Sequence, residues 1–290
     1  MKLNRLGVKT LIFKILNKFP AQTGFRVYHL IQRYLVVTSL KYKIKSTEDS
    51  YRNIERIASK LNLSLKDKKI MEVGSGWVPI LPYFFKFFGG VDLVYTYDLN
   101  HHYSIKEIKK LNNYFQELYG VQVNKLGTRN ELSDKIKYFP NTNVIDAELP
   151  QVDIIFSRFV LEHISPEDLM HMHMKFKDEI PDAYIIHFIS PSDHRAYEDA
   201  SLSLQDFLRF SAKEWEEIQT KFDFHNRWRL PHYLQLFDHL GFQVVHLEYD
   251  CPPIDSEAYK KFKNLDVHDD FNGLTDDELT AGAIKIVLKV

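Results

Sequence analysis

Short runs of β-branched and aromatic residues alternate with amphipathic helical patterns from about residue 48 to the end of the chain. Six runs are predicted strands: KKIMEVG, LVYTYD, VDIIFSR, AYIIHFIS, FQVVHLEYD and AGAIKIVLKV. Between two of them lies SIKEIKKLNNYFQELYG, a predicted helix with Ser104 as its N-cap and Gly120 just past its end. This alternation predicts a doubly wound α/β fold, with a mostly parallel sheet and helices on both faces.

Charge divides the chain into a front segment and a larger domain. Residues 1–47 contain ten Lys or Arg residues and no Asp or Glu. Since the whole chain has a net charge of −1, removing these ten positive charges leaves −11 on residues 48–290. We interpret residues 1–47 as a basic helical segment that either packs on the domain or lies on an anionic membrane surface. Residues 48–290 are the predicted domain.

Several functional classes are disfavoured by the composition. No apolar run reaches about 18 residues, so no membrane-spanning helix is predicted. The single cysteine, Cys251, favours a reducing compartment, and no Cys/His spacing suggests a metal site. We therefore expect a cytoplasmic protein without a metal, peripheral to the inner face of the membrane if the front segment binds lipid. The acidic body argues against nucleic acid as a partner.

A glycine turn, IMEVGSGWVP, ends the first predicted strand. Gly74 and Gly76 permit positive φ and a close approach of the backbone to a ligand. A dinucleotide fingerprint requires a third glycine where this chain has Pro79, which also lacks an N–H group at a helix start. The turn therefore disfavours a pyrophosphate ligand.

Asp98 ends the second predicted strand, 22 residues after Gly76. A carboxylate at this position can accept hydrogen bonds from the two hydroxyls of a ribose. Ribose without pyrophosphate indicates an adenosine with another 5′ substituent. S-adenosylmethionine fits this description, and Glu72 suits its ammonium group.

Four motifs, EVGSGW, YDLN, IDAELP and VDIIFSRFVLEHI, resemble in their order and spacing those of class I S-adenosylmethionine-dependent methyltransferases. The resemblance covers roughly residues 50–290. It implies a Rossmann-like sheet of seven strands with an antiparallel C-terminal strand, and S-adenosylmethionine as the cofactor. Within it, the methionine part lies near the glycine turn, the ribose near Asp98, and the adenine amino group near Asp146. The cofactor-binding residues that it implies are Glu72, Gly74, Ser75, Gly76, Asp98, Leu99, Asp146, Ala147, Ser157 and Arg158.

Residues 191–229 form a connection far longer than is usual between a strand and a helix, so we expect a binding loop or lid there. A hydroxyl acceptor would need a general base, and histidine suits that role. His194, which follows Asp193, is the first candidate, and His187 is the second unless it is a core residue. Polar residues in the same connection are candidates for substrate binding, although several of them could instead pin it to the domain. They are Tyr197, Arg209, His225, Asn226, Arg227 and Arg229.

The same polar connection also resembles that of methyltransferases associated with bacterial surface-polysaccharide synthesis. This resemblance implies methyl transfer to a hydroxyl of a saccharide or glycan precursor. Three alternatives remain open. They are an RNA methyltransferase, a non-catalytic module that keeps the cofactor fold as a binding scaffold, and a nicotinamide oxidoreductase. Glu162 and His163, which follow the VDIIFSR strand, are interpreted as structural residues.

Overall fold

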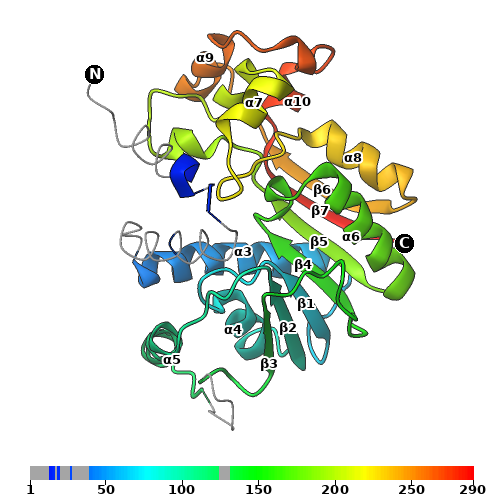
Figure 1. The fold of residues 1–290 in the computed structure, drawn as a ribbon. Coiled ribbons are helices and arrows are strands. Elements are labelled where there is room, and N and C mark those ends of the chain that lie inside the picture. Colours follow the sequence, from blue (N-terminus) through cyan, green and yellow to red (C-terminus); the bar gives the residue numbers. More distant parts are fainter. Residues whose placement is uncertain (1–12, 17, 20–26, 28–38, 124–130) are drawn as a thin grey trace.

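The computed structural model describes residues 13–16, 18–19, 27, 39–123 and 131–290. One sheet of seven strands, in the order β3-β2-β1-β4-β5-β7-β6, forms the centre of the molecule (Figure 1). Only β7 runs against its neighbours in this sheet. The predicted α/β sheet, mostly parallel with an antiparallel C-terminal strand, is confirmed. The strands are β1 Lys69–Val73, β2 Leu93–Asp98, β3 Ile136–Pro140, β4 Ile154–Arg158, β5 Tyr184–Ile189, β6 Gln243–Asp250 and β7 Gly282–Lys289.

Strand β3 is absent from the strands that the sequence pattern predicts individually. It pairs with β2 at the edge of the sheet, and most of its residues are partly accessible to solvent. Such a strand lacks the continuous apolar run of a central strand. Its last residue, Pro140, is tolerated because an edge strand has no neighbour that requires its N–H group.

Helices cover both faces of the sheet. On one face lie α3 Leu40–Lys60, α4 Ile80–Phe87 and α5 Ile105–Tyr119, and on the other lie α6 Pro166–Glu179 and α8 Leu230–His239. The predicted limits of α5 are confirmed, because the Ser104 side chain accepts a hydrogen bond from Glu107 N and Gly120 adopts a left-handed φ of 67°. The apolar face of each helix is buried against the sheet, which is the main stabilising contribution to such layers.

Helix α3 begins eight residues before the predicted start of the domain. Its N-terminal half is part of the core, since Ile44 is 1% and Thr47 6% exposed. The boundary expected between residues 47 and 48 therefore lies inside a helix. Within the described part of the front segment, Phe13 packs against Phe222 with ring centroids 6.0 Å apart. The described part of the chain contains no helix of the length and apolarity needed to cross a bilayer.

Two long connections leave the carboxyl ends of β5 and β6 and pack together. Residues 191–229 carry η2 His194–Tyr197, η3 Asp206–Arg209 and α7 Ala212–Ile218, and residues 251–281 carry α9 Glu257–Lys263, η4 Asp269–Phe271 and α10 Asp276–Thr280. We call these two segments the insertion unit; Figure 1 shows α7, α9 and α10 side by side. They share a small core of their own, formed by Phe207, Leu208, Trp215, Phe262, Phe271 and Leu279. Only the first of these two segments is expected from the sequence.

Candidate active site

A cavity of about 250 Å³ lies where β1 and β4 end. The strand order reverses between these two strands, since β2 and β3 lie on one side and β5 on the other. Open α/β sheets bind their ligands at such a switch point, beyond the carboxyl ends of the strands. Helix α3, the turn after β1 and the end of β4 supply the walls. The lining residues are Tyr42, Lys43, Ser46, Thr47, Glu72, Gly74, Ser75, Gly76, Trp77, Val78, Ile80, Leu81 and Arg158.

The glycine turn has the geometry that its two glycines permit. Gly74 has φ +83° and Gly76 has φ +62°. A Cβ atom at Gly74 would lie 2.3 Å from Cγ2 of Val160, whereas a Cβ at Gly76 would meet nothing within 4 Å. Gly74 therefore allows the turn to pack against the segment after β4. The backbone of Gly76 faces open space, where a ligand can approach it closely.

Asp98 is joined to this turn by hydrogen bonds. Ser75 Oγ donates to its Oδ2 at 3.3 Å, and Asn100 N donates to its Oδ1 at 2.8 Å. His102 Nε2 lies 3.3 Å from Oδ1 of the same carboxylate. The structure thus brings the predicted ribose-binding residue to the rim of the cavity. Leu99, directly after it, is 65% exposed and offers an open apolar surface.

A buried carboxylate and a guanidinium form the floor of the cavity. Glu72 accepts a hydrogen bond from Thr96 Oγ1 at 2.5 Å, and burial raises the pKa of its carboxyl group to about 7. Arg158 opposes this rise through its charge. The Arg158 side chain donates to Ser50 Oγ at 2.8 Å and Ser46 Oγ at 3.1 Å, and so ties β4 to α3.

Helix α3 contributes a residue that sequence reasoning assigned to the basic front segment. Lys43 lines the cavity, and burial lowers the pKa of its ammonium group. A signal for this position existed in the sequence. Leu40, Ile44, Thr47 and Tyr51 continue the helical spacing of the predicted helix towards the N-terminus.

Two predicted adenine contacts lie elsewhere. Asp146 and Ala147 line a separate hollow together with Lys175 and Glu179, which belong to the last turns of α6. Those turns precede β5, so the α6 side of this hollow lies towards the amino edge of the sheet, whereas Asp146 N and Ala147 N each donate to Asn143 O, at 3.1 Å, in the loop after β3. Because the hollow and the cavity share no lining residue, the role of Asp146 and Ala147 as cofactor contacts stays a prediction. The loop directly after β3 is nearer, since Thr142 N donates to Asp98 O at 3.0 Å.

Ser157 and His187 belong to the core. Their side chains are fully buried, and Ser157 Oγ lies 2.7 Å from His187 Nδ1. His187 Nε2 lies 3.0 Å from Nε2 of His173, whose Nδ1 donates to Leu169 O at 2.7 Å. Burial holds the pKa of His187 well below its ordinary value. His187 is thus a core histidine and not a general base, and the Ser157 hydroxyl is occupied away from the cavity.

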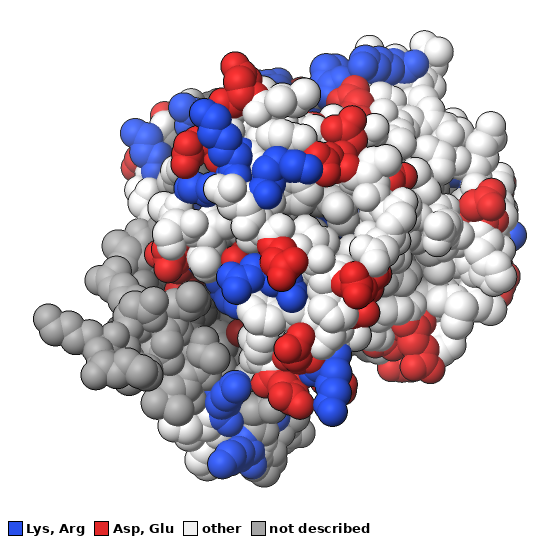
Figure 2. All heavy atoms as spheres, turned by 90° about the horizontal axis from the view of Figure 1, so that it is seen from above, with Lys and Arg blue, Asp and Glu red and all other residues white. Residues whose placement is uncertain are grey.

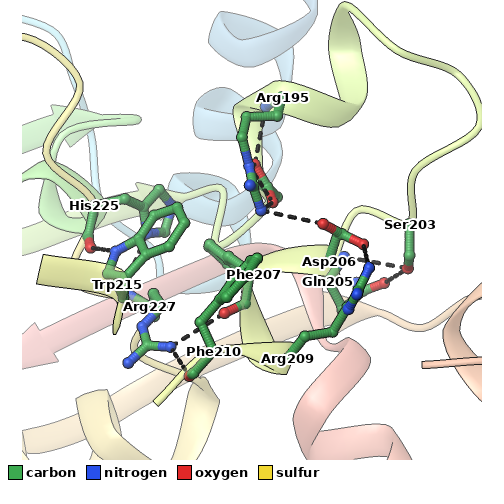
Figure 3. Close-up of polar contacts among 11 residues, drawn as sticks. Arg195, Ser203, Gln205, Asp206, Phe207, Arg209, Phe210, Trp215, His225 and Arg227 are labelled. Atoms are coloured by element: carbon green, nitrogen blue, oxygen red, sulfur yellow. Dashed lines mark hydrogen bonds and ion pairs between the residues drawn. The ribbon is translucent and has the colours of Figure 1, made fainter. Parts of the chain in front are cut away.

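Asp193 is held in an ion-pair network inside the insertion unit. Its Oδ2 lies 2.6 Å from Arg195 Nη2, and Asp206 Oδ2 lies 3.2 Å from the same nitrogen. Figure 3 shows the Arg195 side chain pointing towards Asp206, and its guanidinium lies 5.1 Å from the centre of the Trp215 ring. Asp193 is 2% exposed. Its carboxylate therefore stabilises the turn and is not positioned to assist His194 in catalysis.

The other arginines and Asn226 have structural contacts as well. Arg227 donates to Phe207 O at 3.1 Å (Figure 3), and Arg229, fully buried, donates to Leu279 O at 3.3 Å. Asn226 Nδ2 donates to Leu161 O and Ile164 O at 2.8 and 2.9 Å. These three residues pin the insertion unit to the domain, which favours the structural alternative left open by the sequence, and their role in substrate binding stays a prediction. Arg209 pairs with Asp206 at 3.4 Å and is half exposed.

The remaining predicted substrate contacts lie near the ends of β4 and β5. Tyr197 is 61% exposed, and its hydroxyl lies 3.4 Å from Ser190 Oγ. His194 is exposed and His225 is buried, with ring centroids 5.9 Å apart. His163, interpreted from the sequence as structural, has its ring centroid 5.0 Å from that of His194. The structure therefore brings two predicted residues together with one that was not predicted.

The buried Glu162, beside this cluster, is expected to make the free energy of unfolding depend on pH. It is fully buried, its Oε1 accepts from Ser190 N at 3.2 Å, and burial raises its pKa from 4.5 to about 8. The folded protein keeps a proton that the unfolded chain loses within this window, so this contribution to stability falls as pH rises from about 4.5 to 8. The substitution Glu162→Gln is expected to remove the dependence, and urea unfolding at pH 5 and pH 9 measures it.

The variant is expected to be more stable than the wild type at pH 9 and similar to it at pH 5. Glu167→Gln, an exposed position at the start of α6, serves as the control and should leave the pH profile unchanged. Parallel profiles for the wild type and Glu162→Gln would show that Glu162 is ionised in the folded protein throughout this range.

Acidic and basic side chains are interspersed over the face seen from above. Among the described residues of this face, neither sign forms one continuous field (Figure 2). A broad positive surface for a nucleic-acid backbone is therefore not formed there. Within residues 39–123 and 131–290 and the described part of the front segment, no group of three or more His, Cys, Asp or Glu side chains could hold a metal ion.

Similar solved structures exist, although no family model and no curated protein matches the chain. One is magnesium protoporphyrin IX methyltransferase from Synechocystis PCC 6803 with bound SAH, at TM-score 0.49 and 12% identity over 97% of this chain and 99% of that one. Another is DhpI in a SAM–HEP complex, at TM-score 0.48 and 12% identity over 93% and 97%. A third is mitomycin 7-O-methyltransferase, at TM-score 0.38 and 11% identity over 76% and 48%. At such low identities, these similarities concern the fold alone.

Proposed function

We propose that this protein is an S-adenosylmethionine-dependent methyltransferase. The observation that carries the proposal is the glycine turn at the switch point of the sheet, with the Asp98 carboxylate hydrogen-bonded to Ser75 at its rim. An adenosine-containing ligand with a positively charged sulfur and an amino-acid tail matches this arrangement. When bound, the sulfonium supplies an electrophilic methyl group, and the protein has to hold the acceptor in line with it.

The residues fit this cofactor in two regions. The cavity offers Glu72 for an ammonium group and Lys43 for a carboxylate, as the methionine part requires. Asp98 and the exposed Leu99 offer a hydrogen-bond acceptor and an apolar surface for the ribose and adenine. The open space beside Gly76 is where a bulky sulfur can approach the backbone.

Calorimetry with two cofactors tests the proposal. We expect the full-length protein to bind S-adenosylmethionine and S-adenosylhomocysteine and not to bind NAD, because Pro79 removes an N–H group that a pyrophosphate would need. Binding of NAD with no binding of S-adenosylmethionine would favour the oxidoreductase alternative. Binding of neither S-adenosylmethionine nor NAD would favour the scaffold alternative.

Lys43→Gln is expected to weaken binding of S-adenosylmethionine by about tenfold, since one charge-assisted hydrogen bond contributes about 1.5 kcal/mol. Binding of 5′-methylthioadenosine, which lacks the carboxylate, should stay unchanged in the same calorimetric titrations. Lys45→Gln is the matched control, because Lys45 is exposed on α3 and does not line the cavity. Equal losses for both ligands would contradict the role of Lys43.

We further propose a saccharide hydroxyl as the methyl acceptor. The exposed ring of Tyr197 and the neighbouring imidazoles, next to the ends of β4 and β5, supply the aromatic face and the polar groups that such a ligand needs. A transfer assay with tritiated S-adenosylmethionine distinguishes a saccharide acceptor from an RNA acceptor. The four acceptors to be tested are UDP-glucose, UDP-galactose, GDP-mannose and tRNA. Methylation of tRNA alone would favour the RNA alternative.

The membrane-binding role of residues 1–47 remains a proposal. Within the described residues, Ile15 and Phe19 are about half exposed and stand beside Lys14 and Lys18 in the sequence, a composition suited to an anionic surface. Sedimentation with vesicles of phosphatidylglycerol and phosphatidylcholine tests it. Removal of residues 1–38 should abolish binding if the segment is responsible, and equal binding by both forms would contradict the idea.

A further inference from the structure

Three histidine rings gather where the segment after β4 meets the insertion unit. His163 ends the short helix η1 Leu161–His163, and its ring centroid lies 5.0 Å from that of His194 and 5.7 Å from that of His225. His163 is exposed, whereas His225 is 4% exposed. His194 is exposed as well, so the cluster has two rings open to the surface and one, His225, beneath them.

Hydrogen bonds determine which nitrogen carries the proton in two of these rings. His163 Nδ1 lies 2.8 Å from Phe224 O, and because a carbonyl oxygen only accepts, Nδ1 must donate. In the neutral ring, His163 Nε2 is then an unprotonated acceptor. His225 Nδ1 accepts from Arg227 N at 3.0 Å, so the neutral ring carries its proton on Nε2. Burial lowers the pKa of both rings, which favours the neutral forms.

The two rings thus present complementary groups. His225 Nε2 is buried and has no hydrogen-bond partner within the described chain, although a buried donor is normally satisfied. His163 Nε2 is the basic nitrogen of the adjacent ring. A hydroxyl group donates one hydrogen and accepts another, so it matches this pair. A primary ammonium group, which only donates, does not match it.

The short segment after β4 connects this pair to the proposed cofactor cavity, although neither histidine lines it. Val160, which packs against Gly74 of the glycine turn, belongs to the same short segment as His163. Glu162 Oε1 accepts from Ser190 N at 3.2 Å, which joins that segment to the end of β5. The carboxyl ends of neighbouring parallel strands meet at one edge of the sheet. A group held by these histidines and a ligand held by the glycine turn would therefore be neighbours.

We propose that His163 and His225 form the binding site for the acceptor hydroxyl, with His163 as the general base. This inference rests on the proposed methyl transfer. The acceptor oxygen forms its new bond to the methyl carbon while the carbon–sulfur bond breaks and its electron pair returns to sulfur. The hydroxyl proton passes to His163 Nε2, and His225 Nε2–H donates a hydrogen bond to the oxygen. The positive charge on sulfur is thereby replaced by one on the imidazole.

Although desolvation lowers the pKa of His163, two of its neighbours stabilise the imidazolium that forms during the reaction. Its Nδ1–H keeps the bond to Phe224 O, and the nearby Asp223 carboxylate favours the charged ring. Burial, followed by the charges of His163, Arg229, His194 and Arg227, lowers the pKa of His225 and keeps that ring neutral. Because His163 is exposed, the proton can pass to solvent after the reaction. His194, which the sequence suggested as the general base, then lies beside the base His163 and does not take the proton itself.

Nitrogen NMR tests the tautomers without any substrate. In the full-length protein labelled with ¹⁵N-histidine, two-bond ¹H–¹⁵N spectra at pH 7 should show Nδ1–H and a bare Nε2 for His163. They should show the reverse for His225. His163→Gln and His225→Gln assign the signals, and His239→Gln, an exposed position on α8, serves as the spectral control. A protonated Nε2 on His163, or a bare Nε2 on His225, would overturn the proposal.

The kinetic arm uses whichever acceptor of the four-member panel the wild type methylates. His163→Gln should lower kcat by about 10²–10⁴-fold, remove the acid limb of the kcat–pH profile, and leave the calorimetric affinity for S-adenosylmethionine within twofold. Full turnover with an unchanged pH profile would refute the assignment of the base. If the wild type bound S-adenosylmethionine but methylated no panel member, the acceptor class would fail and the tautomers alone would decide the histidine assignment. No binding of S-adenosylmethionine would instead reject the proposed function.

Discussion

Asp98→Ala is expected to weaken the binding of S-adenosylmethionine by about 100-fold or more. Each hydrogen bond from a hydroxyl to a carboxylate contributes about 1.5–3 kcal/mol, and two ribose hydroxyls would lose their acceptor. The same substitution removes the acceptor of Asn100 N and Ser75 Oγ, so the rim of the cavity would loosen as well. Isothermal calorimetry on the purified variant measures the affinity directly.

The control for this substitution lies at the other end of the same strand. Asp92→Ala removes an exposed carboxylate that pairs with Lys135 at 2.7 Å, just before β2 begins. We expect its cofactor affinity to equal that of the wild type. An unchanged affinity in Asp98→Ala, with a normal unfolding curve, would mean that the ribose is bound elsewhere. Asp98→Asn should fall between the two, because it keeps one acceptor oxygen and loses the charge.

Gly74→Ala is expected to destabilise the fold by about 2–5 kcal/mol. The new Cβ would lie 2.3 Å from Val160 Cγ2 in a residue with φ +83°. Overpacking of this kind costs about 1–3 kcal/mol, and a left-handed backbone costs a residue with a Cβ about 1–2 kcal/mol. Urea unfolding measures the loss, and calorimetry should show that cofactor binding is lost with it, because Gly74 separates the cavity from the segment after β4.

Two further variants separate the clash from the backbone strain. Gly76→Ala has a similar φ of +62° with nothing within 4 Å of its Cβ, so it should cost only the backbone strain of about 1–2 kcal/mol. Combining Gly74→Ala with Val160→Ala should recover part of the loss, since the neighbour that clashes is removed. Equal destabilisation by Gly74→Ala and Gly76→Ala would show that contact with Val160 contributes little.

The periodic elements of the domain could be predicted because their signals are local. Ser104, Ser165 and Gly120 occupy the helix ends expected from their chemistry, since capping depends on residues within one turn. The glycine turn and Asp98 could be paired from spacing alone, because parallel strands bring their carboxyl ends to one edge. The edge strand β3 lacked such a signal, whereas the continuation of α3 into the basic segment had one in the helical spacing of Leu40, Ile44 and Thr47.

The assignments that failed were those that depended on where a polar side chain points. His187 lies on the central strand β5, and Asp193 lies just before the short helix η2. In the sequence, both are polar residues near the end of a strand, which is also where an active-site residue would be. Burial and partners decide between these roles, and both are long-range properties. The second segment of the insertion unit is also unusually long for a connection between two strands, since 31 residues separate β6 from β7. The length of this segment does not show that it packs against residues 191–229.

The amino-acid sequence by itself determined the layered α/β architecture, the helix ends and the glycine turn facing Asp98, because hydrophobic periodicity and backbone preference act between near neighbours. Only the tertiary structure decided which polar groups are buried with partners in the core and that Lys43 lines the cavity. It also decided that His163 and His225 lie close together, with hydrogen bonds that favour opposite tautomers. Those properties arise from hydrogen bonds and burial between segments tens of residues apart, which no local pattern records.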